Sequence, residues 1–371
     1  MVSMNSIHFR RWSDQLRDSG HEVFWFDILD QGYAPSLSWM SQITGWKKRF
    51  LKRRGRTFLK KQTPKLYKTL ENKYDTPVAE AFEKALHTIN PDVVHSFALY
   101  VSCAPIAGVM ERYPNLKWIY SSWGSDLYYF RQFPEHLTDI KRVLTRMDFL
   151  FTDCYRDHHI AKGLGFRGQF MGVFPGGGGY NLEQFKSLHE PYESRRVILV
   201  KGNENRSGRA LNVLKALELC ASYLRDFEVV IFGATNSEVF RFRESEIPNI
   251  QVQGLLEHQD VLKLMGTAAI YIGNSNSDGM PNTLLEAICA GAYPIQSNPG
   301  GATAEIIESG VNGWLIDDCE DTRHIEEVIT TVIQNKNHRQ TAVEKNLIEL
   351  SPMLERAFIR KEVLEAYSFI V

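Results

Sequence analysis

Short apolar segments alternate with amphipathic ones along most of this chain, and this alternation restricts the possible fold more than any other feature. Thr76-Pro77 is a typical helix start, and an apolar stripe continues from Val78 to Ile89. Strands that alternate with helices predict parallel sheets with helical crossovers. In the first half of the chain, the apolar segments predict five strands, at Glu22–Ile28, Asp92–Phe97, Lys117–Ser122, Asp148–Asp153 and Gln169–Phe174.

A glycine run, Pro175–Gly179, interrupts the alternation and is expected to act as a hinge, because it cannot hold a regular element. The 371 residues are enough for two domains. We therefore expect an α/β fold of two doubly wound, Rossmann-like domains facing a central cleft, residues 1–174 and 175–350, with the carboxyl-terminal helix 351–371 packing back on the first. After the run, the chain predicts strands at Arg196–Lys201, Glu228–Phe232, Ile250–Val252, Ala269–Gly273 and Ala292–Gln296, and helices near Ser207–Leu224, His258–Met265, Pro281–Ala290 and Asp321–Gln334.

The amino terminus departs from this pattern. A doubly wound domain normally opens with a strand whose following loop faces the ligand. Here Met1–Met4 is barely long enough for a strand before a helix that carries Phe9, Trp12 and Leu16. Either the first strand is very short or the sequence starts a few residues late.

The composition excludes several classes of protein. With 43% hydrophobic and 12% aromatic residues, the chain is not a disordered one. No window approaches the ~18 uninterrupted apolar residues of a membrane-spanning helix, and no secretory signal opens the chain, so we expect a cytoplasmic protein. Five widely spaced cysteines without a CxxC pair predict reduced, mostly buried thiols rather than disulfides or a zinc site.

One segment is strongly basic. Between Lys47 and Lys68 there are eleven Lys and Arg residues and no Asp or Glu, although the whole chain has 43 basic and 44 acidic residues. Aromatic side chains lie between these cations, a mixture that suits an anionic membrane surface, where each basic residue contributes ~1 kcal/mol. The alternative is a solvated loop. RNA binding is disfavoured because no nucleic-acid module accompanies the segment. We therefore expect segment 46–68 to attach the protein to the inner face of a membrane, and we expect no nucleic-acid partner.

The segment Gly273–Gly301 is the most informative about function. A buried strand ends at Gly273, a small polar loop follows, and Pro281 suits the first position of the next helix. The loop amides at Ser277–Met280 and the start of this helix offer N–H donors and a positive dipole end for phosphate or sugar oxygens. Glu286, one to two turns further on, either points back at the same loop or is an ordinary solvent-facing helix residue.

The stretch from Asp278 to Leu315, DGMPNTLLEAICAGAYPIQSNPGGATAEIIESGVNGWL, resembles the acidic-x7-acidic signature of retaining GT-B glycosyltransferases of family 4, as found in bacterial surface polysaccharide synthesis. The resemblance implies a nucleotide-sugar donor and a glycan or lipid-linked acceptor. It also implies that Glu286 accepts hydrogen bonds from the donor's ribose. The first acidic position, usually Glu, is Asp278 here, and the resemblance implies that it touches the transferred sugar.

The same resemblance assigns other residues to the donor. A pair of cations neutralises the donor diphosphate, and Lys201, Arg206 and Arg209 are the candidates. Fixed cations there stabilise the charge that develops on the departing phosphate. No metal or other cofactor is expected, because these cations take that role and no Asp-x-Asp motif stands at a suitable loop. The remaining donor-binding candidates are Ser277, Gly279, Met280, Pro281, Asn282, Thr283 and Gly254.

The acceptor side departs from the family pattern. Many members have a histidine before Gly-(Ser/Thr)-Asp, but this chain has Trp123 before Gly124-Ser125-Asp126. An indole cannot move protons, so Trp123 either stacks on a sugar or nucleotide or fills the wall. His95 is the candidate catalytic substitute, with a core residue as the alternative. The other acceptor-side candidates are Asn5, Ser6, His8 and Asp126.

These observations favour a hexose-transferring enzyme over two alternatives. A GT-B nucleotide-sugar epimerase or phosphorylase is one, and it would act on the donor without an acceptor. A non-catalytic, membrane-associated subunit is the other, because Trp123 and Asp278 replace the usual residues.

Overall fold

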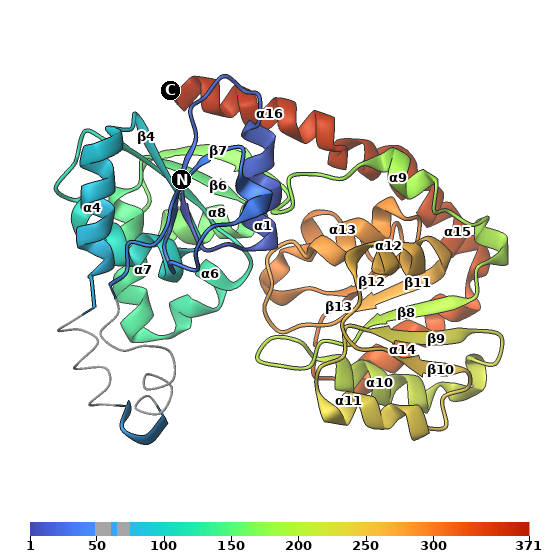
Figure 1. Ribbon diagram of the computed structural model, residues 1–371. Coiled ribbons are helices and arrows are strands. Elements are labelled where there is room, and N and C mark those ends of the chain that lie inside the picture. Colours follow the sequence, from blue (N-terminus) through green and yellow to red (C-terminus); the bar gives the residue numbers. More distant parts are fainter. Residues whose placement is uncertain (49–60, 65–74, 371) are drawn as a thin grey trace. The chain divides into compact units, whose positions relative to one another are not determined.

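The computed structural model describes residues 1–48, 61–64 and 75–370, and the chain divides into two compact units. Unit 1 comprises Met1–Thr152, His158–Gly172 and Leu364–Val371, and unit 2 comprises Asp153–Asp157 and Val173–Val363. The glycine run Pro175–Gly179 is buried within unit 2. Each unit is built around one sheet (Figure 1).

Unit 1 has a sheet in the order β3-β2-β1-β4-β5-β6-β7 among its described residues. The printed pairings from β3 to β6 are all parallel. The strand order reverses direction beside β1, which is the topology of a doubly wound sheet. Its strands are β1 Val2–Ser3, β2 Phe24–Asp27, β3 Ser41–Ile43, β4 Val93–Phe97, β5 Lys117–Ser121, β6 Phe149–Thr152 and β7 Gln169–Val173.

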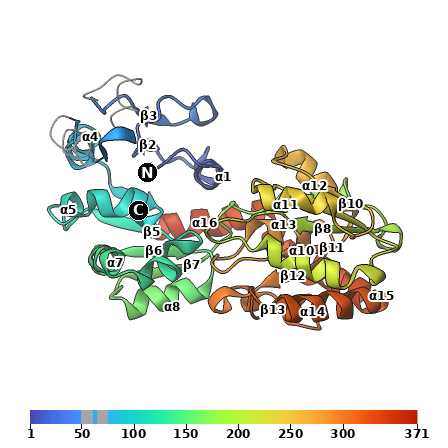
Figure 2. The ribbon, with the colours of Figure 1, turned by 90° about the horizontal axis from the view of Figure 1, so that it is seen from below.

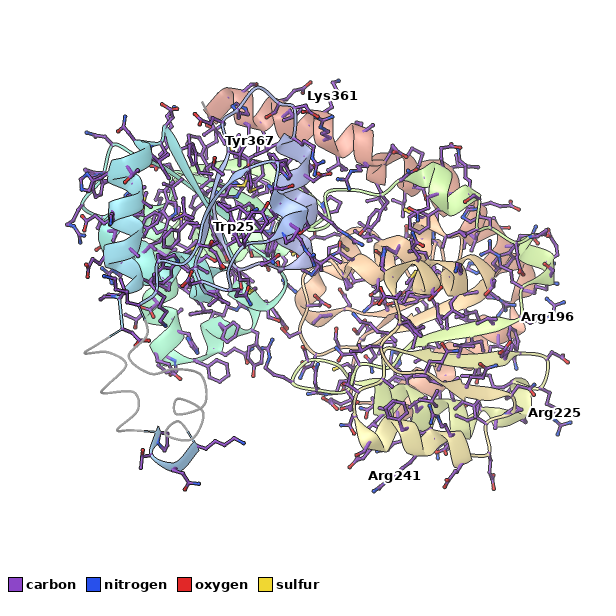
Figure 3. All side chains as sticks on the ribbon, viewed as in Figure 1. Trp25, Arg196, Arg225, Arg241, Lys361 and Tyr367 are labelled. Carbon is purple, nitrogen blue, oxygen red and sulfur yellow. The ribbon has the colours of Figure 1, made fainter. Side chains whose placement is uncertain are left out.

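Helices cover both faces of this sheet because alternate strand residues point to opposite sides. On one face Phe26, Val94 and Trp118 pack in the main core of the unit. The other face is aromatic: Trp25 and Phe97 are fully buried there, with Tyr367 close by (Figure 3). The helices are α1 Ile7–Ser13, α4 Val78–Ile89, α5 Ala107–Met110, α6 Ser125–Tyr128, α7 Pro134–Arg146, most of α8 Tyr155–Gly163 and the end of α16 Arg356–Ile370.

Unit 2 has a parallel sheet in the order β10-β9-β8-β11-β12-β13 among its described residues. The direction of winding changes between β8 and β11. The carboxyl ends of all these strands lie at one edge, because parallel strands run the same way. Their bounds are β8 Val197–Lys201, β9 Glu228–Phe232, β10 Ile250–Val252, β11 Ala268–Gly273, β12 Tyr293–Ser297 and β13 Trp314–Ile316.

Helices cover both faces of the unit 2 sheet (Figures 1 and 2), and an apolar cluster lies on each face. Ile198 and Val200 of β8 join the core under α10 and α14, whereas Leu199 joins the core under α12 and α13. This alternation within one strand is the pattern of a sheet buried on both faces. The helices are α9 Leu182–Lys186, α10 Ala210–Leu219, α11 Ser237–Arg241, α12 His258–Thr267, α13 Asn282–Cys289, α14 Thr322–Gln334 and α15 Lys336–Lys345.

The two doubly wound sheets confirm the expected α/β class, and the corrections concern short elements. The first strand exists but is short, pairing with β2 and β4 through Val2 and Ser3. Sequence patterns missed β3 and β13, because each has three residues at a sheet edge and so lacks a periodic pattern. Pro281 is the N-cap rather than the first helical residue, because its ψ of 122° is extended.

The five cysteines are free, and all but the half-buried Cys319 are buried, as expected. Among the helices of the described ranges, none is long and apolar enough to cross a membrane. The basic segment 46–68 lies mostly outside the described residues, so its proposed contact with a membrane stays a prediction. Trp46, at its start, stacks on Phe26 in unit 1 with ring centroids 5.4 Å apart.

Candidate functional site

The loops after β8 and β11 meet at the point where the unit 2 sheet changes its direction of winding. Ligands of open α/β sheets bind at such a point. The two loops pair with each other: the Arg209 amide donates to the Asn274 carbonyl at 3.0 Å, and the Asn276 amide donates to the Ser207 carbonyl at 2.9 Å. The predicted phosphate-binding and sugar-binding segments are therefore adjacent in space.

Helix α13 carries three polar side chains, and a side chain from a different element holds each one. The Tyr180 hydroxyl donates to Asn282 Oδ1 at 2.8 Å. The Tyr271 hydroxyl, on β11, donates to Thr283 Oγ1 at 2.9 Å.

The third polar side chain of α13 is Glu286, whose Oε1 lies 2.7 Å from Nε2 of His258 on α12. Glu286 is only 3% exposed, so the interpretation of it as a solvent-facing residue is wrong. Sequence reasoning missed His258, because nothing in the local pattern links it to a residue 28 positions later.

Asp278 and Glu286 act on the same buried phenol. Burial raises the pKa of the Tyr271 hydroxyl, and the negative charges of Asp278 and Glu286 raise it further. Tyr271 therefore stays protonated and remains a donor to Thr283. Asp278 itself is half-buried, and its Oδ1 accepts from the Gly279 amide at 2.9 Å. The two acids therefore have different partners: Asp278 accepts from its own loop, and Glu286 lies against His258.

Asp153 lies against the loop that follows β11. A Cβ atom placed on Gly279 would meet the two carboxylate oxygens of Asp153 at 2.3 and 2.4 Å. Only glycine allows this approach, which explains the residue at position 279. No sequence pattern connected Asp153, which is 7% exposed, with this loop.

The three candidate cations differ in their surroundings. The Arg209 guanidinium pairs with Glu320, and it donates to the carbonyls of Asn205 and Gly208 at 3.1 and 2.8 Å. It therefore holds its own loop together. Lys201 is the last residue of β8 and is half-buried, and its side chain has no hydrogen bond or ion pair to any residue in the described part of the chain. Arg206 is exposed in the same loop.

The other donor candidates contribute mainly through the backbone. Ser277 and Pro281 are buried, and the Met280 side chain packs in the core beneath α13. Gly254 follows β10 at the same sheet edge, and its carbonyl accepts from the Gly233 amide at 3.0 Å. A Cβ atom on Gly254 would meet its nearest neighbours at 3.8 Å, so this glycine has room for a side chain.

In unit 1 the structure brings His8 and Trp123 together, with ring centroids 5.8 Å apart. Three other acceptor-side candidates have structural roles. Asp126 accepts hydrogen bonds from the Leu99 amide and the Tyr120 hydroxyl at 2.9 and 3.1 Å. The Ser6 hydroxyl caps α1, and the backbone N–H of Asn5 donates to Gln31 Oε1 at 3.3 Å.

His95 was expected to be catalytic, but it lies in the environment of a core residue and is 3% exposed. Its Nδ1 hydrogen-bonds to the Tyr367 hydroxyl, its Nε2 lies 2.8 Å from Ser121 Oγ, and its ring stacks on Phe97 with centroids 4.0 Å apart. Burial lowers the pKa of His95 well below its ordinary value, so the ring is neutral. Both ring nitrogens are therefore used within the protein.

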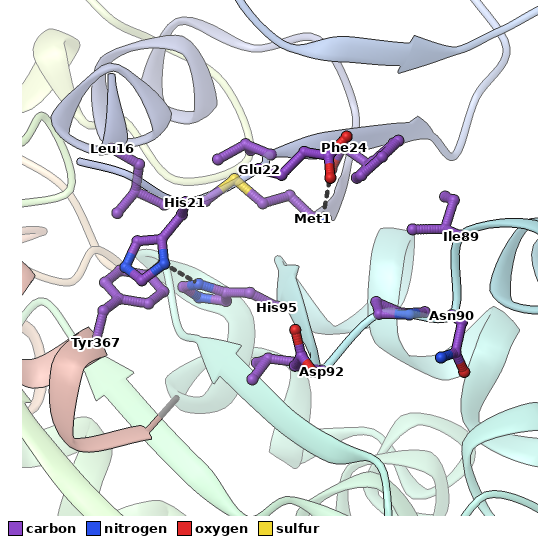
Figure 4. A pocket seen from close by; sticks show the side chains of 13 residues that line it. Met1, Leu16, His21, Glu22, Phe24, Ile89, Asn90, Asp92, His95 and Tyr367 are labelled. Carbon is purple, nitrogen blue, oxygen red and sulfur yellow. Dashed lines mark hydrogen bonds between the residues drawn. The ribbon is translucent and has the colours of Figure 1, made fainter. Parts of the chain in front are cut away.

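A pocket of about 240 Å³ lies beside His95, and Met1, Phe24 and Asp92 also line it (Figure 4). Phe24 begins β2, and the first residue of β4 lies in the same wall. The pocket thus opens at the amino ends of the strands, the edge opposite to the one where ligands of this topology bind.

One group of described residues has the spacing of metal ligands: Asp153, Cys154 and Asp157 offer atoms within 4.8 Å of one another. Its chemistry is unsuited to a cation. The Arg156 guanidinium donates to Asp157 Oδ1 at 2.8 and 3.0 Å, which neutralises that carboxylate. Burial raises the pKa of the Cys154 thiol, and a neutral thiol is a poor ligand.

Comparison with known proteins gives one family match. Residues 183–347 match the family model described as Glycosyl transferases group 1. The match covers 165 of the 371 residues, and it includes β8, β11 and α13, which carry the site. None of the curated protein sequences matches the chain.

Several solved structures share the fold of the whole chain. Sucrose-phosphate synthase from Thermosynechococcus elongatus has a TM-score of 0.71 at 15% identity, over 100% of this chain and 98% of its own. A glycosyltransferase from Rickettsia africae has 0.69 at 14%, over 100% and 97%. HepE from Anabaena, in complex with UDP-glucose, has 0.69 at 11%, over 99% and 98%. At these identities the likeness shows the fold, which is that of the GT-B glycosyltransferases.

Proposed function

We propose that this protein is a retaining glycosyltransferase of family 4, which moves a hexose-type sugar from a nucleotide-sugar donor to a saccharide or lipid-linked saccharide in surface glycan synthesis. One observation carries the proposal. The loop with Asp278 and the helix with the buried Glu286 follow β11 at the winding change of the unit 2 sheet, within the residues that match the group 1 model, and this loop is hydrogen-bonded to the loop that carries Arg206 and Arg209. The UDP-glucose bound to HepE supports a nucleotide diphosphate sugar as the donor.

In this proposal α13 and the loop before it bind the donor. Glu286 accepts hydrogen bonds from the ribose hydroxyls, and Asp278 accepts from hydroxyls of the transferred sugar. The backbone N–H groups at the start of α13 meet phosphate oxygens, which the positive end of the helix dipole favours. Tyr271 donates to Thr283 Oγ1, so it orients the Thr283 hydroxyl as a donor toward the same oxygens.

Two cations neutralise the diphosphate, and we assign this role to Lys201 and Arg206. Arg209 is assigned to the structure of the loop, because Glu320 and two carbonyls already occupy its guanidinium. Negative charge develops on the departing phosphate as the glycosidic bond breaks, so cations placed there lower the barrier. This arrangement uses no metal ion in the transfer.

Retention follows from attack on the face that the phosphate leaves. The departing phosphate oxygen takes the proton of the acceptor hydroxyl as the new bond forms, so the protein needs neither a carboxylate nucleophile nor His95 as a base. On unit 1 we assign the acceptor to the surface around His8 and Trp123, where the indole offers a flat apolar face to a sugar ring.

A thermal-shift panel of UDP-glucose, GDP-mannose and ADP-glucose tests the proposal on the unaltered chain and on Glu286→Ala. A donor at a hundred times its Kd stabilises the folded state by about 2.7 kcal/mol, which raises the melting temperature by about 5 °C or more. We expect Glu286→Ala to lose most of this increase. Glu218→Ala, which changes an exposed glutamate on α10, is the matched control and keeps it.

Failure of every nucleotide sugar to stabilise the unaltered chain contradicts the proposal. With a stabilising donor in hand, release of nucleoside diphosphate that depends on an added glycan acceptor shows transfer. Turnover of the donor without any acceptor favours the epimerase or phosphorylase alternative, and binding without turnover favours the non-catalytic subunit.

A further inference from the structure

Glu286 is a carboxylate in an apolar layer. Its side chain is 4% exposed, and the residues before and after it on α13, Leu285 and Ala287, belong to the core beneath the helix. A charged group in such a place is unstable unless donors satisfy it. The identity and position of its donors therefore decide how this carboxylate is held.

His258 supplies one such donor from the first residue of α12. A carboxylate only accepts hydrogen bonds, so the 2.7 Å contact requires a hydrogen on His258 Nε2. The imidazole itself is 40% exposed, and Nε2 is the ring nitrogen that faces Glu286. His258 is thus half-exposed, but its Nε2 is hydrogen-bonded to the buried Glu286. This contact is suited to fix the orientation of the Glu286 carboxylate.

The ring has a defined position because α12 and α13 pack together. Leu262 and Met265 of α12 lie in the same apolar cluster as Leu284 and Leu285 of α13. The hydrogen bond therefore joins two helices whose separation is set by buried side chains. Tyr271 and Tyr180 hold Thr283 and Asn282 in the same manner.

We propose that His258 is a positioning residue for Glu286: it engages Oε1 and turns the rest of the carboxylate toward the ribose hydroxyls of the nucleotide-sugar donor. This inference rests on the proposed function, which assigns Glu286 to the ribose. His258 acts through Glu286 and takes no part in breaking or forming the glycosidic bond. Replacing His258 by a residue without a donor should therefore weaken donor binding, whereas kcat, the turnover rate of the enzyme–donor complex, should change little.

Three variants separate a positioning role from a structural one. His258→Gln keeps an N–H donor of similar reach, and His258→Leu keeps the bulk without a donor. Gln259→Leu changes the exposed neighbouring residue, whose side chain has no hydrogen bond or ion pair within the described ranges. The probe is UDP-glucose, or GDP-mannose or ADP-glucose where the thermal panel selects one of these, and the readouts are Kd by calorimetry together with KM and kcat.

We expect His258→Leu to raise Kd and KM about 10- to 100-fold, as for a lost hydrogen bond to a charged group, with kcat within about threefold. His258→Gln restores most of the affinity, and Gln259→Leu leaves it unchanged. In the Glu286→Ala background, His258→Leu has almost no further effect, because the group it positions is gone. Melting curves without donor show that each variant folds. If His258→Leu does not fold, His258→Asn, whose amide is too short to reach, replaces it.

Two results overturn the inference. One is a folded His258→Leu variant that binds the donor as tightly as the unaltered chain. The other is a His258→Gln variant that is as weak as His258→Leu. If Glu286→Ala itself binds the donor normally, the proposed function of the site fails, whereas a loss in Glu286→Ala without a loss in His258→Leu refutes only the role of His258.

Discussion

Adding a single methyl group at Gly279 tests whether Asp153 and the loop after β11 form one rigid surface. A Cβ atom at Gly279 would lie 2.3 Å from an Asp153 oxygen, whereas ordinary contact begins near 3.4 Å, so the loop or the carboxylate must move by about 1 Å. Overpacking of this kind costs about 1–3 kcal/mol. At about 2–4 °C for each kcal/mol, Gly279→Ala should melt several degrees below the unaltered chain. Displacement of the loop should also weaken the binding of the nucleotide sugar.

Gly254→Ala is the matched control for this prediction. Neither glycine has a positive φ, and Gly254 has no neighbour closer than 3.8 Å to the added carbon. The alanine therefore only restricts the unfolded chain, which stabilises the protein by about 0.4–1 kcal/mol. The two substitutions should shift the melting temperature in opposite directions.

A double-mutant cycle with Asp153→Ala isolates the steric cause. Removing the carboxylate makes room for the added methyl group, so Gly279→Ala should cost less than half as much in that background. The reasoning is refuted if Gly279→Ala melts no lower than Gly254→Ala, or if its cost is unchanged when Asp153 is absent.

Two further predictions concern the cations and the buried histidine. Lys201→Met should weaken nucleotide-sugar binding about tenfold or more with little change in melting temperature. Arg209→Met should instead act mainly on stability and lower the melting temperature. Calorimetry and melting curves compare them, and equal losses of affinity with unchanged stability would show that Arg209 also binds phosphate. Burial lowers the pKa of His95, so below pH about 6.5 the unfolded chain takes up a proton that the folded unit 1 refuses. Stability should therefore fall toward acid pH, by up to about 1.4 kcal/mol per pH unit from this group, and His95→Gln should flatten the melting-temperature profile between pH 7.5 and 5.5. Parallel profiles for the two proteins would show that His95 is not the cause.

The pattern of apolar residues was sufficient to predict most of the fold. Strands such as Glu228–Phe232 coincide with their predicted bounds, because each is an apolar run that must be buried on both faces of a parallel sheet. The elements that escaped prediction, β3 and β13, are short edge strands stabilised by their pairing with a neighbour rather than by their own residues.

The candidate site divides in the same way. The sequence was sufficient to place Asp278 and Glu286 on one strand–loop–helix segment, because these elements follow one another within a few residues, and the role of the two acids stays a prediction. The partners of this segment were not found. His258 is 28 positions from Glu286, and Tyr180 is 102 positions from Asn282, so only the folded sheet brings them within hydrogen-bond distance.

Local order along the chain thus determined which segments become strands and helices and where the two acids stand, since those properties depend on neighbouring residues. The tertiary structure decided which side chains those acids meet. It assigned Arg209 to its loop and placed Asp153 against Gly279. It also enclosed His95 beside Tyr367, 272 positions away. Such contacts depend on how helices pack across a sheet. The spacing of residues along the sequence does not directly give the distance between two side chains in the folded protein.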